Sequence, residues 1–237
     1  VSPLLLRWKV PGPGTARWKM EDTNFPAVQS LLGTLEDLDS LPIDTVTIDT
    51  DVKEIDGEYF AFAVFTAPKN FFRPEVGDDI SAPSRTVSVL ARYFPFGNEQ
   101  ANLATRRDIR VERPPVLFVH GLWDSRRSWD TFTEIVKDPL WSDRVHRVNY
   151  SSSHGRELAY HMSGHVIGDG IRDARAKVNS LIVRAQVDVV AHSMGGLLVR
   201  DFADETAYRN KDSYGEGAFH KLLFLDTPHE GSVLADM

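Results

Sequence analysis

The segment "VDVVAHSMGGLLVR", residues 187–200, joins an apolar run to a second apolar stretch through a serine flanked by small residues. The run before Ser193 predicts a strand buried on both faces, and the stretch after it predicts a helix. Ala191 and Gly195 stand two places before and two places after the serine. A cramped strand-to-helix turn leaves no room for larger side chains at those two places. We therefore expect a tight turn that projects the Ser193 hydroxyl.

The second half of the chain, from Pro114 onward, alternates apolar runs with helical patterns. Strands are predicted at residues 114–121, 144–150, 187–192 and 221–227, and helices at 166–185 and after Ser193. This alternation predicts an α/β fold with a parallel sheet that helices cover on both faces.

The first half, residues 1–113, has the short alternating strands of an antiparallel, sandwich-like unit. Strands are predicted at residues 45–52, 58–68, 85–94 and 106–113, with a hairpin turn at Asp56–Gly57. The pattern changes near residues 112–116, so we expect two domains, 1–113 and 114–237.

Composition and charge exclude several classes of protein. A net charge of −7 argues against a nucleic-acid surface, and no apolar run is long enough to predict a transmembrane helix. The chain has no cysteine, which rules out disulfides and a thiolate nucleophile. The acidic stretch "DTDVKEIDG", residues 49–57, lacks the length and the final glutamate of a calcium-binding loop, and no metal site is expected.

Three motifs carry a resemblance to the α/β-hydrolase family of lipases and esterases. "AHSMGG" at 191–196 resembles the nucleophile elbow of that family, with Ala191 in place of the usual first glycine, as in Bacillus-type lipases. "VLFVHGLWDSRRSWD" at 116–130 is similar to its first central strand and oxyanion loop, and "LFLDTPHEGS" at 223–232 to the turn after the nucleophile helix. The resemblance implies that residues 114–237 form the N-terminal part of a catalytic domain.

The resemblance also implies a role for individual residues. Ser193 would be the nucleophile, and the backbone N–H groups of Leu122 and Met194 would form the oxyanion hole. Trp123 would line the substrate pocket, whereas Trp129 is interpreted as a core residue. The family needs no cofactor. His120, His192 and His229 are interpreted as structural residues of the turns that hold them.

The family order is Ser, then Asp or Glu, then His. Only His220 and His229 follow Ser193, and neither has the position expected of the base. Asp226 is the alternative for the acid, although related sequences often carry glycine there. We therefore expect a sheet cut short after four core strands, with the triad histidine and its acid outside this chain. A C-terminal segment or a second chain would then complete the sheet.

The resulting hypothesis is a serine carboxylester hydrolase, a lipase or esterase, that acts on an ester or lipid substrate. An acyltransferase with the same nucleophile and a non-catalytic binding or surface module remain alternatives. The polar stretch at 197–219 favours soluble esters over an oil interface. Exported bacterial hydrolases sometimes carry an immunoglobulin-like domain before the catalytic one. That resemblance predicts an immunoglobulin-like domain at 1–113 and favours a secreted or cell-surface protein.

Overall fold

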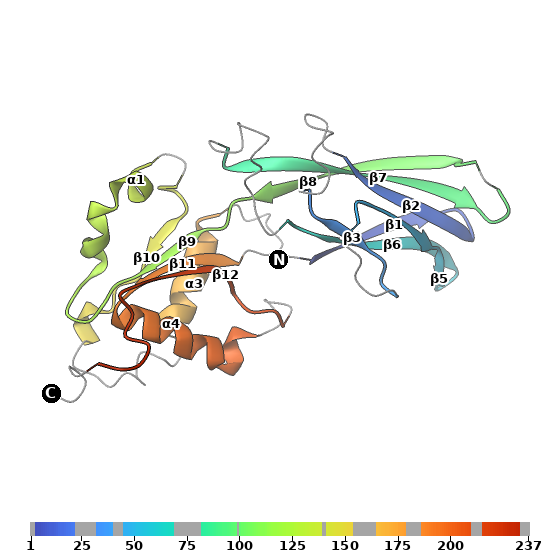
Figure 1. Ribbon diagram of the computed structural model, residues 1–237. Helices are drawn as coiled ribbons and strands as arrows, with labels where there is room; N and C mark the ends of the chain where they lie inside the picture. Colours follow the sequence, from blue (N-terminus) through green and yellow to red (C-terminus); the bar gives the residue numbers. More distant parts are fainter. Residues whose placement is uncertain are drawn as a thin grey trace. The chain divides into compact units, whose positions relative to one another are not determined.

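A computed structural model describes residues 3–21, 32–39, 45–68, 82–98, 100–138, 141–153, 165–178, 186–209 and 215–232. The chain divides into two compact units, Val1–Arg113 and Pro114–Met237 (Figure 1). Each unit has its own secondary structure and its own apolar core.

Within its described residues, the N-terminal unit forms two four-stranded antiparallel sheets. In the first sheet, β6 (Glu58–Thr66) lies between β1 (Pro3–Val10) and β3 (Thr34–Glu36) and also pairs with β5 (Lys53–Ile55). The second sheet has the order β4 (Thr47–Asp51), β2 (Gly14–Glu21), β7 (Ser84–Pro95) and β8 (Leu103–Glu112). Asp56 and Gly57, with φ of 52° and 78°, form the predicted hairpin turn between β5 and β6.

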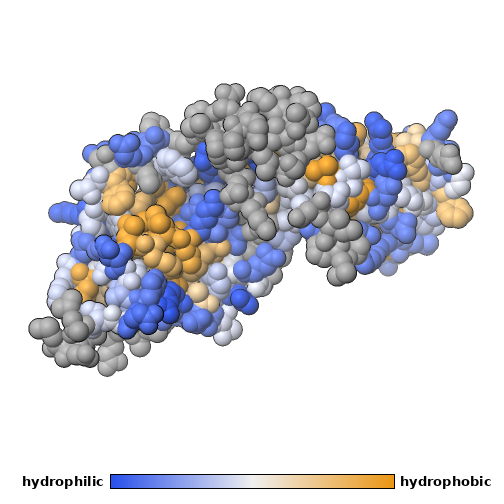
Figure 2. Space-filling model, viewed as in Figure 1, coloured by the Kyte–Doolittle hydropathy of each residue, from blue (hydrophilic) through white to orange (hydrophobic). Residues whose placement is uncertain are grey.

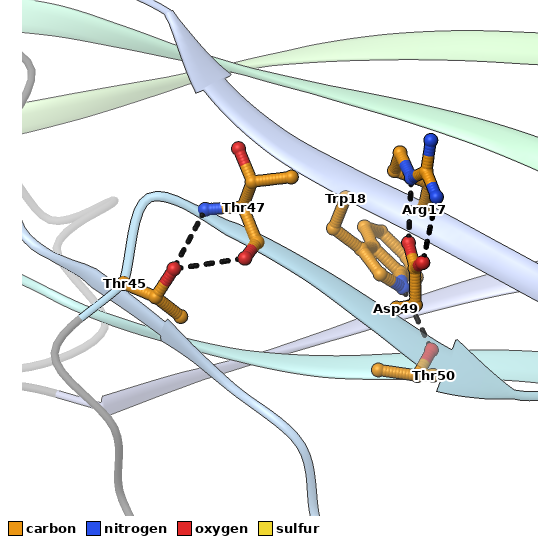
Figure 3. Close-up of polar contacts among 6 residues, drawn as sticks. All are labelled: Arg17, Trp18, Thr45, Thr47, Asp49 and Thr50. Atoms are coloured by element: carbon orange, nitrogen blue, oxygen red, sulfur yellow. Dashed lines mark hydrogen bonds and ion pairs between the residues drawn. The ribbon is translucent and has the colours of Figure 1, made fainter.

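Alternate residues of these strands build the core of the N-terminal unit. On β7, alternate residues form the inward face, because Val87, Val89, Ala91 and Tyr93 are all buried. On β2, Trp18 is buried and donates a hydrogen bond of 2.9 Å from Nε1 to the Thr50 hydroxyl of β4. The preceding residue, Arg17, points outward and holds the Asp49 carboxylate through two hydrogen bonds (Figure 3). This contact lowers the pKa of Asp49.

The C-terminal unit contains the predicted sheet of four parallel strands. Their order is β10 (Val145–Arg147), β9 (Val116–Val119), β11 (Val187–His192) and β12 (Phe219–Leu225). Helices α3 (Ile167–Ala176) and α4 (Met194–Asp204) pack on one face. The other face carries the 3₁₀ helix η3 (Arg126–Thr131) and the short α1 (Thr133–Val136). Two further 3₁₀ turns are η4 (Ser151–Ser153) and η5 (Thr206–Tyr208).

Burial explains why these segments adopt their structure. Leu117 and Val119 of β9 pack with the apolar stripes of α3 and α4, whereas Phe118 faces the opposite side and packs with Trp129 of η3. Trp129 is only 2% exposed, which confirms its interpretation as a core residue. The helix predicted over 166–185 runs from Ile167 to Ala176, and residues 179–185 lie outside the described part.

Strand β12 forms an edge of the parallel sheet within the described residues, since it pairs with β11 alone. Its neighbouring side chains Leu222 and Leu223 are 43% and 54% exposed. Figure 2 shows apolar side chains gathered in the region of this sheet. In the part of the chain that the structure describes, no helix has the length and apolar character needed to cross a membrane.

Candidate active site

The join between β11 and α4 places Ser193 in a strained backbone conformation. Its φ and ψ are 52° and −126°, a region that residues with a side chain rarely occupy. Two hydrogen bonds hold it: the Ser193 N–H donates to the Leu225 carbonyl at 2.9 Å, and its carbonyl accepts from the Gly196 N–H at 3.0 Å. Strain of about 1–3 kcal/mol persists only where the surrounding structure enforces it. The fold therefore holds this serine at the tip of a sharp turn.

The residues around Ser193 must be small because the backbone of neighbouring segments lies very close to them. A Cβ added to Gly195 would lie 2.5 Å from the His120 carbonyl oxygen and 2.7 Å from that of Val119. A Cβ on Gly196 would lie 2.0 Å from the Thr227 hydroxyl. Ala191, on the strand side of the turn, is completely buried. The spacing that was seen in the sequence thus has a steric cause: the start of α4 presses against the ends of β9 and β12.

The loop after β9 lies directly against the serine. A Cβ added to Gly121 would be 2.9 Å from Ser193 Cβ and 3.0 Å from His192 Nδ1. Leu122 follows this contact and is half-buried, and Trp123 is 76% exposed with a φ of 60°. The structure therefore brings the 120–123 loop and the 192–195 turn together, with Met194 as the first residue of α4.

This contact leads to a first prediction. Replacing Gly121 with Ala should push the 120–123 loop away from Ser193, because neither neighbouring atom belongs to the free end of a flexible chain. If Ser193 is the nucleophile that the sequence predicts, ester turnover should fall roughly 10- to 100-fold, the loss that follows a shift of about 1 Å. Gly12→Ala is the control, since its Cβ would meet only the Tyr93 hydroxyl at 3.6 Å. Equal turnover in the two variants would contradict a functional contact between the loop and Ser193.

His120 is excluded as a base by its own hydrogen bonds. It is fully buried, its Nε2 accepts from the Tyr150 N–H at 3.3 Å, and its Nδ1 lies 2.9 Å from the Gly121 carbonyl oxygen. Because an amide N–H only donates and a carbonyl only accepts, Nδ1 carries the proton and Nε2 the lone pair. Both ring nitrogens are therefore occupied by the backbone.

His229, in the turn after β12, is tied to helix α4. Arg200 donates from one guanidinium nitrogen to His229 Nδ1 at 2.9 Å and to the His229 carbonyl at 3.2 Å. An arginine has no acceptor, so Nδ1 accepts this hydrogen bond through its lone pair. This arrangement supports the structural role that was predicted for His229.

The other histidine after the serine lies at the opposite end of the sheet. His220 Nδ1 is 2.7 Å from Asp188 Oδ1. This pair links the N-terminal ends of the neighbouring strands β11 and β12. Along β11, Asp188 and Ser193 are five residues apart, which corresponds to roughly 16 Å of extended chain. Within the described residues, no histidine forms a hydrogen bond with the Ser193 hydroxyl. His154 and His161 lie outside those residues.

Asp226 has a positive φ of 48°, and it is the third residue with a positive φ at this edge of the sheet, after Trp123 and Ser193. It follows β12 directly, next to the Leu225 carbonyl that binds the Ser193 N–H, and it is exposed. Asp226, Ser193 and Trp123 each follow a neighbouring parallel strand, so strained residues gather where parallel sheets commonly bind their ligands.

Among the described residues, no group of three His, Asp or Glu side chains is placed to hold a metal ion.

Tyr150 is a residue at this edge that sequence analysis did not single out. It stands three residues after β10 and its ring stacks on that of His120, with centroids 4.0 Å apart. Its hydroxyl donates to the His120 carbonyl, and burial, assisted by the charge of Asp124, raises the pKa of the phenol. The only available signal was a tyrosine after a short strand, and that does not reveal a contact 30 residues away in the chain.

Residues 116–236 match a model of the alpha/beta hydrolase family, and the chain therefore belongs to that family. Among solved structures, the chain is similar to a lipase from Bacillus licheniformis in its mature form, at 21% identity and a TM-score of 0.37. The match covers 52% of this chain and 44% of that lipase, so the chain spans less than half the lipase's length. No curated protein matches the sequence.

Proposed function

We propose that the protein is a serine carboxylester hydrolase that works through an acyl-enzyme on Ser193. The observation that carries the proposal is the strained serine at the strand-to-helix turn, packed against the loop that contains Leu122. Backbone strain of this kind is found at functional sites, where it positions a reacting group. Membership of the alpha/beta hydrolase family supports a hydrolase.

In the proposed reaction, the Ser193 oxygen attacks the ester carbonyl and a general base takes the hydroxyl proton. The N–H groups of Leu122 and Met194 stabilise the negative charge on the carbonyl oxygen, helped by the N-terminus of α4. The alcohol leaves with a proton, and water then hydrolyses the acyl-serine. Because no histidine within the described residues forms a hydrogen bond with the Ser193 hydroxyl, we assign the base to a group outside those residues.

Trp123 follows the Gly121 position that lies against Ser193 by two residues, and its exposed indole would offer the proposed substrate an apolar surface. We therefore propose esters whose acyl or alcohol part is apolar. The same nucleophile would serve an acyltransferase, which differs only in the group that accepts the acyl chain.

The experiment follows p-nitrophenyl butyrate hydrolysis by the protein together with the C-terminal segment or second chain that is expected to complete the sheet and supply the base. It is run with and without a primary alcohol as a competing acceptor. A hydrolase is expected to release p-nitrophenol and butyrate in equal amounts, with little butyrate ester of the added alcohol. Transfer of most acyl groups to the alcohol would instead establish the acyltransferase. No turnover above that of Ser193→Ala would contradict both and favour a binding module.

A further inference from the structure

Two buried side chains that take no chemical part in the proposed reaction contact the backbone of the 120–123 loop, His120 from within the loop and Tyr150 from the segment after β10. We propose that His120 and Tyr150 form a clamp that fixes the direction of the Leu122 N–H, and so act as positioning residues for the oxyanion hole. This inference rests on the proposed function and names the residues that keep its oxyanion donor in place.

The clamp holds one specific peptide unit. The Nδ1–H of His120 points at the Gly121 carbonyl oxygen, 2.9 Å away. The peptide bond between Gly121 and Leu122 is trans, as the described residues include no cis bond. In a trans peptide, the N–H points away from the carbonyl of the same unit. A Gly121 carbonyl held by the His120 ring therefore directs the Leu122 N–H to the other side of the loop, away from that ring.

Tyr150 holds His120 in this orientation from three directions. Its backbone N–H fixes the tautomer by donating to Nε2, and its ring lies almost parallel to the imidazole, at 9°. Its hydroxyl donates to the His120 carbonyl, which belongs to the peptide unit just before Gly121. Burial raises the pKa of the phenol, so the hydroxyl keeps its proton and remains a donor at neutral pH.

The loop needs such support because it contains a strained residue. Trp123 has a φ of 60°, which is unfavourable for a large aromatic side chain, and its indole is too exposed for packing to hold the backbone in place. The far end of the loop is anchored by Ser125, whose hydroxyl caps η3 by accepting from the Arg127 N–H. The near end is anchored by the clamp. Releasing the clamp should allow the peptides from Gly121 to Asp124 to relax.

The test compares two matched Tyr→Phe substitutions. Tyr150→Phe removes the hydroxyl that donates to His120 and keeps the stacked ring. Tyr93→Phe is the control, because the buried Tyr93 hydroxyl also donates to a backbone carbonyl, that of Pro13 at 3.0 Å, but in the N-terminal unit. A third variant, His120→Asn, keeps a donor in the place of Nδ1 and loses the acceptor at Nε2.

Amide hydrogen exchange of residues 120–124 and steady-state hydrolysis of p-nitrophenyl butyrate are measured for each variant. We expect Tyr150→Phe to speed exchange in this segment about tenfold and to lower kcat roughly 10- to 100-fold with KM unchanged, since oxyanion donors act in the transition state. The exchange rate and kcat of His120→Asn should lie between those of Tyr150→Phe and the wild type. Tyr93→Phe should change neither the exchange rate nor kcat.

Unchanged exchange at 120–124 in Tyr150→Phe, or an unchanged kcat, would overturn the clamp. So would an equal loss of kcat in Tyr93→Phe, because general destabilisation would then explain both variants. Turnover that survives Ser193→Ala would overturn the proposed function instead, and the exchange comparison would still decide whether Tyr150 holds the loop.

Discussion

Replacing Ser193 with Ala is expected to lower ester turnover by roughly 10⁴-fold or more, because the nucleophile of an acyl-enzyme mechanism has no substitute. The fold should survive, with a change in unfolding free energy within about 1 kcal/mol. The hydroxyl makes no hydrogen bond within the described residues, so its removal leaves no buried partner unsatisfied. Steady-state kinetics and thermal unfolding of the two proteins give both quantities.

Ser193→Gly separates the role of the backbone from that of the hydroxyl. Glycine adopts a φ of 52° and a ψ of −126° without strain, whereas alanine retains the strain. We expect both variants to be inactive and the Gly variant to be more stable than the Ala variant by about 1 kcal/mol, the reverse of the usual order. Most of the turnover surviving in either variant would show that Ser193 is not the nucleophile.

Replacing Gly195 with Val should damage folding itself. The new Cβ would lie 2.5 Å and 2.7 Å from two backbone carbonyl oxygens of the β9 end, and backbone atoms in a central strand have little freedom to move. We expect a loss of about 3 kcal/mol or more in unfolding free energy, at the upper end of overpacking costs. Chemical denaturation followed by circular dichroism measures this loss.

Gly168→Ala is the matched control in the same unit. Gly168 lies inside α3, and its added Cβ would meet Phe202 at 3.5 Å, an ordinary contact. Alanine is a better helix former than glycine by up to about 1 kcal/mol, so this variant should be as stable as the wild type or more stable. If Gly195→Val were as stable as Gly168→Ala, the steric account of the turn around Ser193 would be wrong.

The parallel sheet was predictable because its strands are buried on both faces and leave long apolar runs in the sequence. Residues 116–119 and 187–192 form β9 and β11 where those runs lie. The turn at Ser193 was also predictable, because close backbone approach permits only small residues at Ala191 and Gly195. Both features leave a local pattern in a single sequence: a run of apolar residues for a buried strand, and small residues at a fixed spacing for the turn.

Strands β1 and β2 were not predicted. In β1, the three consecutive leucines at residues 4–6 hide the alternation that the structure reveals, in which Leu5 is exposed and its two neighbours pack toward the core. The pairing of His120 with Tyr150 was also beyond prediction, because it joins the ends of two neighbouring parallel strands across 30 residues. The orientation of a ring and its tautomer depend on such tertiary contacts, which leave no periodic pattern.

Ser193 is proposed to be an activated nucleophile at this edge of the sheet. The most direct test of this proposal is to treat the protein with a fluorophosphonate, in which the serine oxygen displaces fluoride from phosphorus, and to locate the adduct by mass spectrometry of the peptides. We expect one phosphonyl group per chain, on Ser193, which is absent after heat denaturation and slower to form in Gly121→Ala. An adduct on another residue, or no adduct in the folded protein, would contradict it.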